Sequence, residues 1–444
     1  MHQKNLIYHK RRQELIASVR KQYPDLVGSI VIFSRFEHGR HRFLQDSSFY
    51  YLTGVQEPGA ALLLALDGAA TLYIPAFTTR RAQWVDNAMS NDQKTAEELG
   101  FVGINYLGDP QPGYEACPLF SASAYRSIVA AIEKNGARAT VFTCVAQDAH
   151  HYVEQYFILE RLKTFSAAFA HIVDISPMLA RMRRKKTHEE VELLYKAVEV
   201  TMLAHEAAAC ALGDGVNEAS VQAHIEYVFT DSGASPAFPT IVGSGHNSTV
   251  LHYQQNNRVM RTGDVVVIDI GAQLQHYCAD LTRTYPVSGK FTQRQREVYE
   301  IVLQTQEHIA SQVKPGVWLC NKDRPQESLH HKAVAFLDTM GYAKYFPHGI
   351  GHFLGLDVHD VGDRLEPLHE GDVITIEPGI YIAAEKLGIR IEDNYWVVRD
   401  GVECLSAALP KSVPDIEAFA QLSMDDPNDN REQITTDEDD FDVQ

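Results

Sequence analysis

Histidine and glycine are concentrated in one short stretch, "HGIGHFLGLDVHD" at 348–360, where three of thirteen residues are histidine and three are glycine. Glycine inside a helix or strand costs roughly 0.5–1 kcal/mol relative to alanine, so this backbone is shaped for something other than regular packing. Imidazole is a common metal ligand and a general acid or base near neutral pH. The stretch therefore indicates metal or catalytic chemistry if carboxylates elsewhere have matching spacing. Otherwise it is a polar loop in a chain with 20 histidines.

Two aspartates occupy strand-like runs in "GDVVVIDIGAQLQHYCADLTRTYPV" (263–287). A hairpin centred on Leu274–Gln275 places Asp269 directly opposite Asp280, on one face of the sheet. Directly opposed side chains have Cβ atoms about 4.5–5.5 Å apart, which is close enough to bind the same cation. Because Leu-Gln is not a favoured two-residue turn, we expect a looser turn with this register.

Two glutamates are arranged in the same way in "VITIEPGIYIAAEKLGIRIEDNYWVV" (373–398). A hairpin centred on Ala384–Glu385 places Glu377 opposite Glu392. A carboxylate in the apolar middle of a strand is unfavourable unless it is paired or coordinated. Taken alone, Glu392 could simply pair with Arg390.

Four clustered carboxylates would repel one another strongly unless divalent cations neutralised them. A single cation needs fewer anionic ligands, so the pattern predicts a site for two metal ions. Oxygen ligands with one imidazole suit Mn²⁺, Co²⁺ or Zn²⁺, and the order of metal affinities does not distinguish among these three ions.

The elements before residue 165 alternate between helical and strand-like patterns. A helix is predicted over 9–23, with Leu15, Ile16 and Val19 on one stripe. Strands are predicted at 28–34 and on both sides of a turn within 59–75, and a short helix at 92–100. This alternation indicates an α/β domain with a parallel or mixed sheet, which we place at 1–173.

A second domain is expected at 174–420. Thr187 and Glu190 form a predicted capping box, and the apolar stripe after them has helical spacing. The last twenty residues hold nine acidic side chains and one arginine, so 421–444 is expected to be a disordered acidic tail.

These motifs resemble the pita-bread metallopeptidases, and among them most closely the aminopeptidase P family. The resemblance rests on "HGIGHFLG", "TIEPGIY" and "RIED" in the second domain and on "RRQEL" and "LQDSSFYYLTGVQEPGAALLL" in the first. It covers about residues 8–410. It implies an aminopeptidase P-type α/β N-terminal domain, followed by a catalytic domain with the pita-bread α+β fold.

The resemblance implies a ligand for each metal position. Asp269 would bind one metal, and Asp280 would bridge both. His352 and Glu377 would bind the second metal, and Glu392 would be the other bridge.

The resemblance also implies catalytic groups that do not bind metal. His252 of "STVLHYQQN" and His359 would contact the substrate and stabilise the oxyanion of the attacked carbonyl group. Glu377, in addition to binding metal, would move a proton from the attacking water to the leaving nitrogen.

Less specific roles fall to four further residues. Arg390 and Tyr381 would orient a ligand and relay protons. His348 would line a substrate subsite, or is simply a hydrogen-bonded polar residue. Asp393 is expected at the surface.

The implied reaction removes the first residue from peptides with proline second. One alternative is a prolidase, which cleaves only Xaa-Pro dipeptides and would need an arginine for the substrate carboxylate. In prolidases of this fold a long insertion supplies it, whereas here "HDVGDRLEPLHEGDVITIEPG" continues without one. The other alternative is a non-enzymatic binding protein on the same scaffold, which an absent ligand would signal; all five are present.

Composition narrows the partners and the location. The net charge of −18 argues against nucleic acid as a partner. The six cysteines are scattered and form no CxxC pairs, which is typical of reduced thiols. The sequence has no long apolar run, and its N-terminus has no apolar secretory segment. These observations predict a cytoplasmic protein that does not enter membranes. Relatives of this kind imply a homo-oligomer, either a dimer or a tetramer.

Overall fold

The computed structural model describes residues 5–37, 42–85, 89–111, 113–116, 122–136, 139–145, 153–363 and 365–421. The chain divides into two compact units, residues 1–183 and 184–444. The predicted domain boundary at 173/174 lies just before α6 (Ser176–Arg184), whereas this division falls at the end of that helix. Most of the predicted acidic tail, 422–444, lies outside the described residues. None of the described helices has the length and apolar composition that a membrane span requires.

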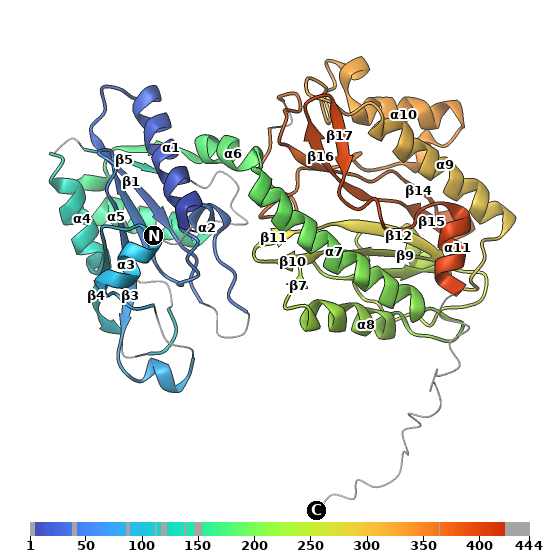
Figure 1. The fold of residues 1–444 in the computed structure, drawn as a ribbon, viewed down its shortest axis with the longest axis horizontal. Coiled ribbons are helices and arrows are strands. Elements are labelled where there is room, and N and C mark those ends of the chain that lie inside the picture. The colour runs from blue at the N-terminus through green and yellow to red at the C-terminus, as the bar shows by residue number, and fades with distance from the viewer. Residues whose placement is uncertain are drawn as a thin grey trace, which may run out of the picture. The chain divides into compact units, whose positions relative to one another are not determined.

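The N-terminal unit contains one mixed six-stranded sheet with the order β4-β3-β2-β1-β5-β6 (Figure 1). β1 and β2 are antiparallel, as are β2 and β3, and the other neighbours are parallel. The strands are β1 (Gly28–Phe33), β2 (Ala61–Ala65), β3 (Ala70–Phe77), β4 (Gly103–Gln111), β5 (Thr140–Thr143) and β6 (Ile172–Asp174). The helices are α1 (Leu6–Gln22), α2 (Ser47–Thr53), α3 (Gln93–Leu99), α4 (Arg126–Glu133) and α5 (Val153–Phe165). The predicted α/β class is confirmed.

Helix α1 contains the predicted apolar stripe and a buried cation. Leu15, Ile16 and Val19 are all buried, as expected. Arg12 is fully buried, and its guanidinium donates to the carbonyl groups of Leu52, Leu99 and Gly100. Because these carbonyl groups end α2 and α3, Arg12 satisfies acceptors that the two helices leave unpaired.

The C-terminal unit surrounds short antiparallel sheets with helices (Figure 1). α7 packs against β9–β12, α8 against β7 and β8, and α9 against β13–β15. The helices are α7 (His188–Cys210), α8 (Glu218–Asp231), α9 (Gln293–Ala310), α10 (Leu329–Thr339) and α11 (Val413–Gln421). The strands are β7 (Ser235–Pro236), β8 (Ile241–Ser244), β9 (Val265–Ile270), β10 (Ala272–Leu274), β11 (Tyr277–Cys278), β12 (Leu281–Pro286), β13 (Val373–Ile376), β14 (Gly379–Ile382), β15 (Leu387–Arg390), β16 (Asp393–Val398) and β17 (Gly401–Cys404).

Helix α7 begins with the predicted capping box. The Thr187 side chain accepts from the backbone N–H of Glu190, and the Glu190 side chain accepts from the backbone N–H of Thr187. Both ends of the motif thereby satisfy N–H groups that have no partner within the helix.

The first predicted hairpin forms with a different register. Its turn is centred on Gln275 and His276, which both have positive φ, and Asp269 faces Thr282. Positive φ at both central positions is the geometry of a type I′ turn, which matches the twist of the strands. The predicted register was therefore wrong by two positions. A shift of two keeps the side chains on the same face, so Asp269 and Asp280 are diagonal neighbours on one surface.

The second predicted hairpin has the expected register. Gly379 faces Arg390 in the β14–β15 ladder, and Ile376 faces Asp393 in the β13–β16 ladder. Glu377 and Glu392 lie in the gap between these two ladders. There, the backbone N–H of Glu392 donates to the carbonyl oxygen of Thr282 on β12. The segment that carries Glu392 therefore pairs here with β12 of the first hairpin, which brings the two predicted hairpins together.

Candidate metal centre

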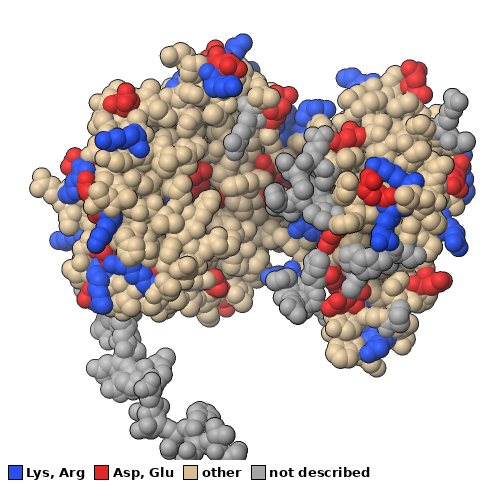
Figure 2. All heavy atoms as spheres, turned by 180° about the vertical axis from the view of Figure 1, so that it is seen from behind, with Lys and Arg blue, Asp and Glu red and all other residues tan. Residues whose placement is uncertain are grey.

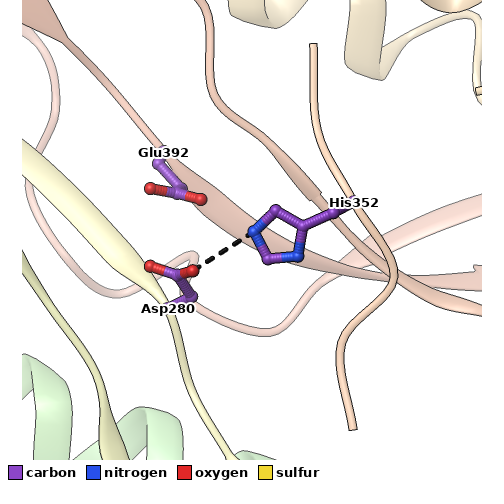
Figure 3. A group of neighbouring side chains, drawn as sticks. All are labelled: Asp280, His352 and Glu392. Carbon is purple, nitrogen blue, oxygen red and sulfur yellow. Dashed lines mark ion pairs between the residues drawn. The ribbon is translucent and has the colours of Figure 1, made fainter. Parts of the chain in front are cut away.

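Three predicted ligands, Asp280, His352 and Glu392, converge in the C-terminal unit. Each offers a ligand atom, and these atoms all lie within 4.8 Å of one another. Figure 3 shows the side chains of Asp280 and Glu392, which directly precede β12 and β16, with the imidazole ring of His352 approaching from an irregular segment. His352 Nε2 lies 3.3 Å from Asp280 Oδ2.

Backbone contacts hold the histidine segment against β13. The backbone N–H of His352 donates to Thr375 Oγ1 at 3.0 Å, and the N–H of Thr375 donates to the carbonyl oxygen of His352 at 2.9 Å. A Cβ atom on Gly351 would lie 2.0 Å from the carbonyl oxygen of Thr375. Glycine is therefore required here because the two backbones approach too closely for a side chain.

The other two predicted ligands border this group. Asp269 Oδ2 accepts from Arg390 Nη2 at 2.6 Å. Glu377 Oε1 lies 3.7 Å from His352 Nε2. The same Glu377 oxygen accepts a hydrogen bond from Thr375 Oγ1 at 3.4 Å. All five predicted ligands thus lie in one neighbourhood, in which Glu377 is partly buried and the other four are buried.

The pKa values of the acids in the site are raised mainly by burial, and repulsion between the carboxylates adds to this effect. Burial, and then the charge of Asp269, raise the pKa of Asp280 to about 7. Burial also raises the pKa values of Glu377 and Glu392, and neighbouring carboxylates add to this effect. Burial lowers the pKa of His352, but hydrogen bonding to Asp280 and the surrounding negative charge outweigh it and raise the value to about 9. The site strongly attracts positive charge.

Several carboxylate oxygens in the site are buried without a hydrogen-bond partner among the described residues: Asp269 Oδ1, Asp280 Oδ1 and Glu392 Oε1. An unpaired buried carboxylate oxygen is strongly unfavourable. A hard or borderline divalent cation would satisfy all three, because carboxylate oxygen and imidazole nitrogen are its usual ligands. The residues present therefore fit a bound metal.

A hydrogen-bonded network lies beside the carboxylates. Arg390, which is 4% exposed, donates from Nη1 to the Tyr381 hydroxyl group at 2.9 Å and from Nε to Thr282 Oγ1 at 3.2 Å. Thr282 Oγ1 donates in turn to Glu392 Oε2 at 2.7 Å. Tyr381 is 3.0 Å from His348 Nε2. Arg390 therefore contacts one predicted ligand directly and a second through Thr282.

The network also affects two groups predicted to bind substrate. Burial raises the pKa of Tyr381 to about 12, so its hydroxyl group stays protonated. Burial and the Arg390 charge lower the pKa of His348 to about 4, so its ring is neutral at neutral pH. A cavity of about 330 Å³ lies beside this ring, with Leu319, Cys320, Phe346 and Ile350 in its lining.

The two remaining predicted histidines are exposed. The centroid of the His359 ring is 4.2 Å from that of His352, so His359 borders the metal ligands. His252 lies close enough to His348 to lower its pKa through charge repulsion. All three histidines of the 348–360 stretch thus lie near the predicted ligands.

Two residues were placed wrongly or missed from the sequence. Asp393 was expected at the surface, but it is fully buried and pairs with Arg283 at 2.7 Å. The burial of Asp393 is favourable because the Arg283 cation lies opposite it. Arg283 is 110 positions away in the sequence, so a local pattern does not show this pairing. Thr282 was not singled out. The alternation in "DLTRTYP" places Thr282 on the same face as Asp280, and that signal could have identified it.

Comparisons with known proteins show the family to which the chain belongs. Residues 192–399 match the model for metallopeptidase family M24, and residues 8–107 match that for the aminopeptidase P N-terminal domain. An Xaa-Pro aminopeptidase from Haemophilus influenzae is 32% identical over 92% of this chain and 96% of its own length. An Xaa-Pro dipeptidase from Pyrococcus furiosus is 40% identical, over 52% of this chain and 66% of its own.

A solved structure is similar over nearly the whole chain. Escherichia coli aminopeptidase P with the inhibitor Pro-Leu superposes with a TM-score of 0.78 and is 29% identical, covering 95% of this chain and 99% of that one. The predicted fold is confirmed in both units by these matches. The chain belongs to metallopeptidase family M24 and carries the N-terminal domain of aminopeptidase P.

Proposed function

We infer that this chain is an Xaa-Pro aminopeptidase, which hydrolyses the first peptide bond of substrates that have proline in the second position. The observation that carries this inference is the convergence of Asp280, His352 and Glu392, with unpaired carboxylate oxygens, in a chain similar to an Xaa-Pro aminopeptidase over 92% of its length. The presence of all five predicted ligands disfavours a non-enzymatic binding protein.

Two divalent ions would be held by the five predicted ligands. Asp269 would bind one ion, and His352 and Glu377 would bind the other. Asp280 and Glu392 would bridge both. When bound, the ions would lower the pKa of a coordinated water and polarise the substrate carbonyl group. We propose Mn²⁺ as the bound ion. Co²⁺ and Zn²⁺ are the alternatives, because this ligand set also suits them.

The protein's own groups would orient the substrate and move protons. Glu377 would accept a proton from the attacking water on its carboxylate and transfer it to the prolyl nitrogen as the bond breaks. His252 and His359 would donate hydrogen bonds to the oxygen on which negative charge develops. Arg390 would hold Asp269 in position through the 2.6 Å contact.

The substrate would occupy the side of the site that His348 and Tyr381 line. The neutral His348 ring, the protonated Tyr381 hydroxyl group and the adjacent cavity suit an uncharged proline ring and the residues around it. Proline has a fixed φ and forms a tertiary amide, so a site for it must be dedicated to that shape.

A peptide panel tests the reaction and distinguishes it from a dipeptidase. The holoenzyme should release the first residue from Xaa-Pro-Yaa peptides at least as fast as it cleaves Xaa-Pro dipeptides, and it should cleave Xaa-Ala-Yaa poorly. Chelation should abolish turnover, and Mn²⁺ should restore it. Mass spectrometry identifies the products. Cleavage confined to dipeptides would support the prolidase alternative, which the Pyrococcus furiosus relative keeps open.

The surroundings of the enzyme can also be proposed. Lys and Arg are interspersed with Asp and Glu on the face that Figure 2 shows, and the net charge is −18, so peptides are better partners than nucleic acid. Cysteines in the described part of the chain are free thiols, which supports a cytoplasmic location. We propose a homo-oligomer, a dimer or a tetramer, and light scattering would measure its mass.

A further inference from the structure

A carboxylate away from the metal centre receives an unusual number of hydrogen bonds. Glu218, the first residue of α8, exposes none of its surface. Its Oε1 accepts from the backbone N–H of Ser244 at 2.7 Å, from Ser244 Oγ at 2.6 Å and from Asn247 Nδ2 at 3.2 Å. Its Oε2 accepts from the Tyr253 hydroxyl group at 2.8 Å and from the backbone N–H of Arg258 at 2.9 Å.

These donors belong to one segment, residues 244–258, and Glu218 contacts both of its ends and its middle. Hydrogen bonds to an ionised acceptor are roughly twice as strong as those between neutral groups. The N-terminus of α8 further favours a negative charge at this position. A single buried side chain therefore holds a segment that starts at the end of β8 and contains a short 3₁₀ helix (Gly245–Thr249) followed by a loop.

The same segment carries His252, the residue directly before Tyr253. A second contact attaches the 244–258 segment to β15, the strand that carries Arg390. In this contact the backbone N–H of Gly388 donates to Ser248 Oγ at 2.8 Å. Glu218 holds one side of the segment and β15 the other. Among the described residues, none forms a hydrogen bond with the backbone of His252.

We infer that Glu218 is a positioning residue for His252, which it holds at the substrate side of the metal centre through Tyr253 and the two ends of the 244–258 segment. This inference rests on the proposed role of His252 in the reaction. It predicts that a change of Glu218 lowers the activity because His252 is displaced, so the loss should occur only when His252 is present.

Glu218→Gln disturbs the contacts with little change in volume. Oε2 would become an NH₂ group, or Oε1 would if the amide were flipped. In either case a backbone N–H, that of Arg258 or of Ser244, would face another donor. The matched control is Glu226→Gln, the same change two turns further along α8, where the carboxylate accepts from Gln222 and Thr240.

The experiment is a double-mutant cycle on the holoenzyme with an Xaa-Pro-Yaa peptide. Glu218→Gln should lower kcat/KM about tenfold to a hundredfold, as a misplaced catalytic group does, and with the same split between kcat and KM as His252→Ala. In the His252→Ala background Glu218→Gln should cause no further loss. Metal content should be unchanged, and Glu226→Gln should match the wild type.

Tyr253→Phe provides a second, milder variant if Glu218→Gln does not fold. It removes only the hydroxyl group and should lose less activity, again only when His252 is present. Equal losses with and without His252, or no loss while His252→Ala is impaired, would overturn the inference. If His252→Ala retained full activity, the proposed role of His252 would fail first, and the inference with it.

Discussion

Arg283 Nη2 lies 2.7 Å from Asp393 Oδ1, and neither side chain exposes any surface. The guanidinium also donates to the carbonyl oxygen of Glu392 at 2.8 Å. Asp393 in turn accepts from Ser406 Oγ at 2.7 Å and from Lys411 Nζ at 3.0 Å. This buried pair therefore joins β12 to β16 next to Glu392, a predicted bridging ligand.

Asp393→Ala should destabilise the protein strongly, because it leaves the Arg283 cation buried without its partner. Loss of one partner of a buried pair typically costs about 3–5 kcal/mol, which urea unfolding would measure. Arg283, Lys411 and hydrogen bonds outweigh burial and lower the pKa of Asp393 to about 2, so its contribution holds at neutral pH and is lost only as pH falls toward that value. The exposed Asp400→Ala is the control. Equal stability of the two variants would contradict the assigned importance of the pair.

Asp280→Ala should lose both metal ions, because its carboxylate is the proposed bridge between them. Elemental analysis of the purified variant would measure the stoichiometry, with Asp400→Ala again as the control. Full metal occupancy in Asp280→Ala would show that the assigned bridge is wrong.

His352 and His359 have adjacent rings but different proposed roles. His352→Ala should lose metal. His359→Ala should keep its metal and lose turnover by a factor of about 10²–10⁴, the usual contribution of a general acid or base. Metal content and kcat should be measured on the same preparations. A metal-replete His352→Ala with a metal-free His359→Ala would reverse the two assignments.

His205 should make the C-terminal unit sensitive to acid. It is fully buried between the carbonyl oxygen of Leu281 and the Tyr285 hydroxyl group, and burial lowers its pKa to about 3. In the unfolded chain it takes up a proton near its ordinary pKa of about 6.5. Stability is therefore fully present above that pH and falls progressively below it, by about 2 kcal/mol at about pH 5.

His205→Gln tests this dependence, because an amide can donate to Leu281 and accept from Tyr285 without titrating. Urea unfolding between about pH 7 and about pH 5 should show a shallower loss of stability in the variant than in the wild type. The exposed His224→Gln should keep the wild-type slope. An unchanged slope in His205→Gln would refute the prediction.

The sequence by itself determined which residue types could bind metal and which strands carry them. Alternation along a strand is local, so the faces of Asp269 and Asp280 and the register of Glu377 with Glu392 could be read from spacing. The capping box of α7 was equally local. Similarity of motifs supplied the family, which the comparisons with known proteins confirm.

Only the tertiary structure decided features that depend on distant partners. The first hairpin turns at Gln275 and His276 because the folded strands impose positive φ on residues that do not favour it. The burial of Asp393 depends on Arg283, and the hydrogen bonds of Glu218 come from a segment that begins 26 residues later. A buried charge is stable only when its partners surround it, and those partners are brought together by folding rather than by sequence spacing.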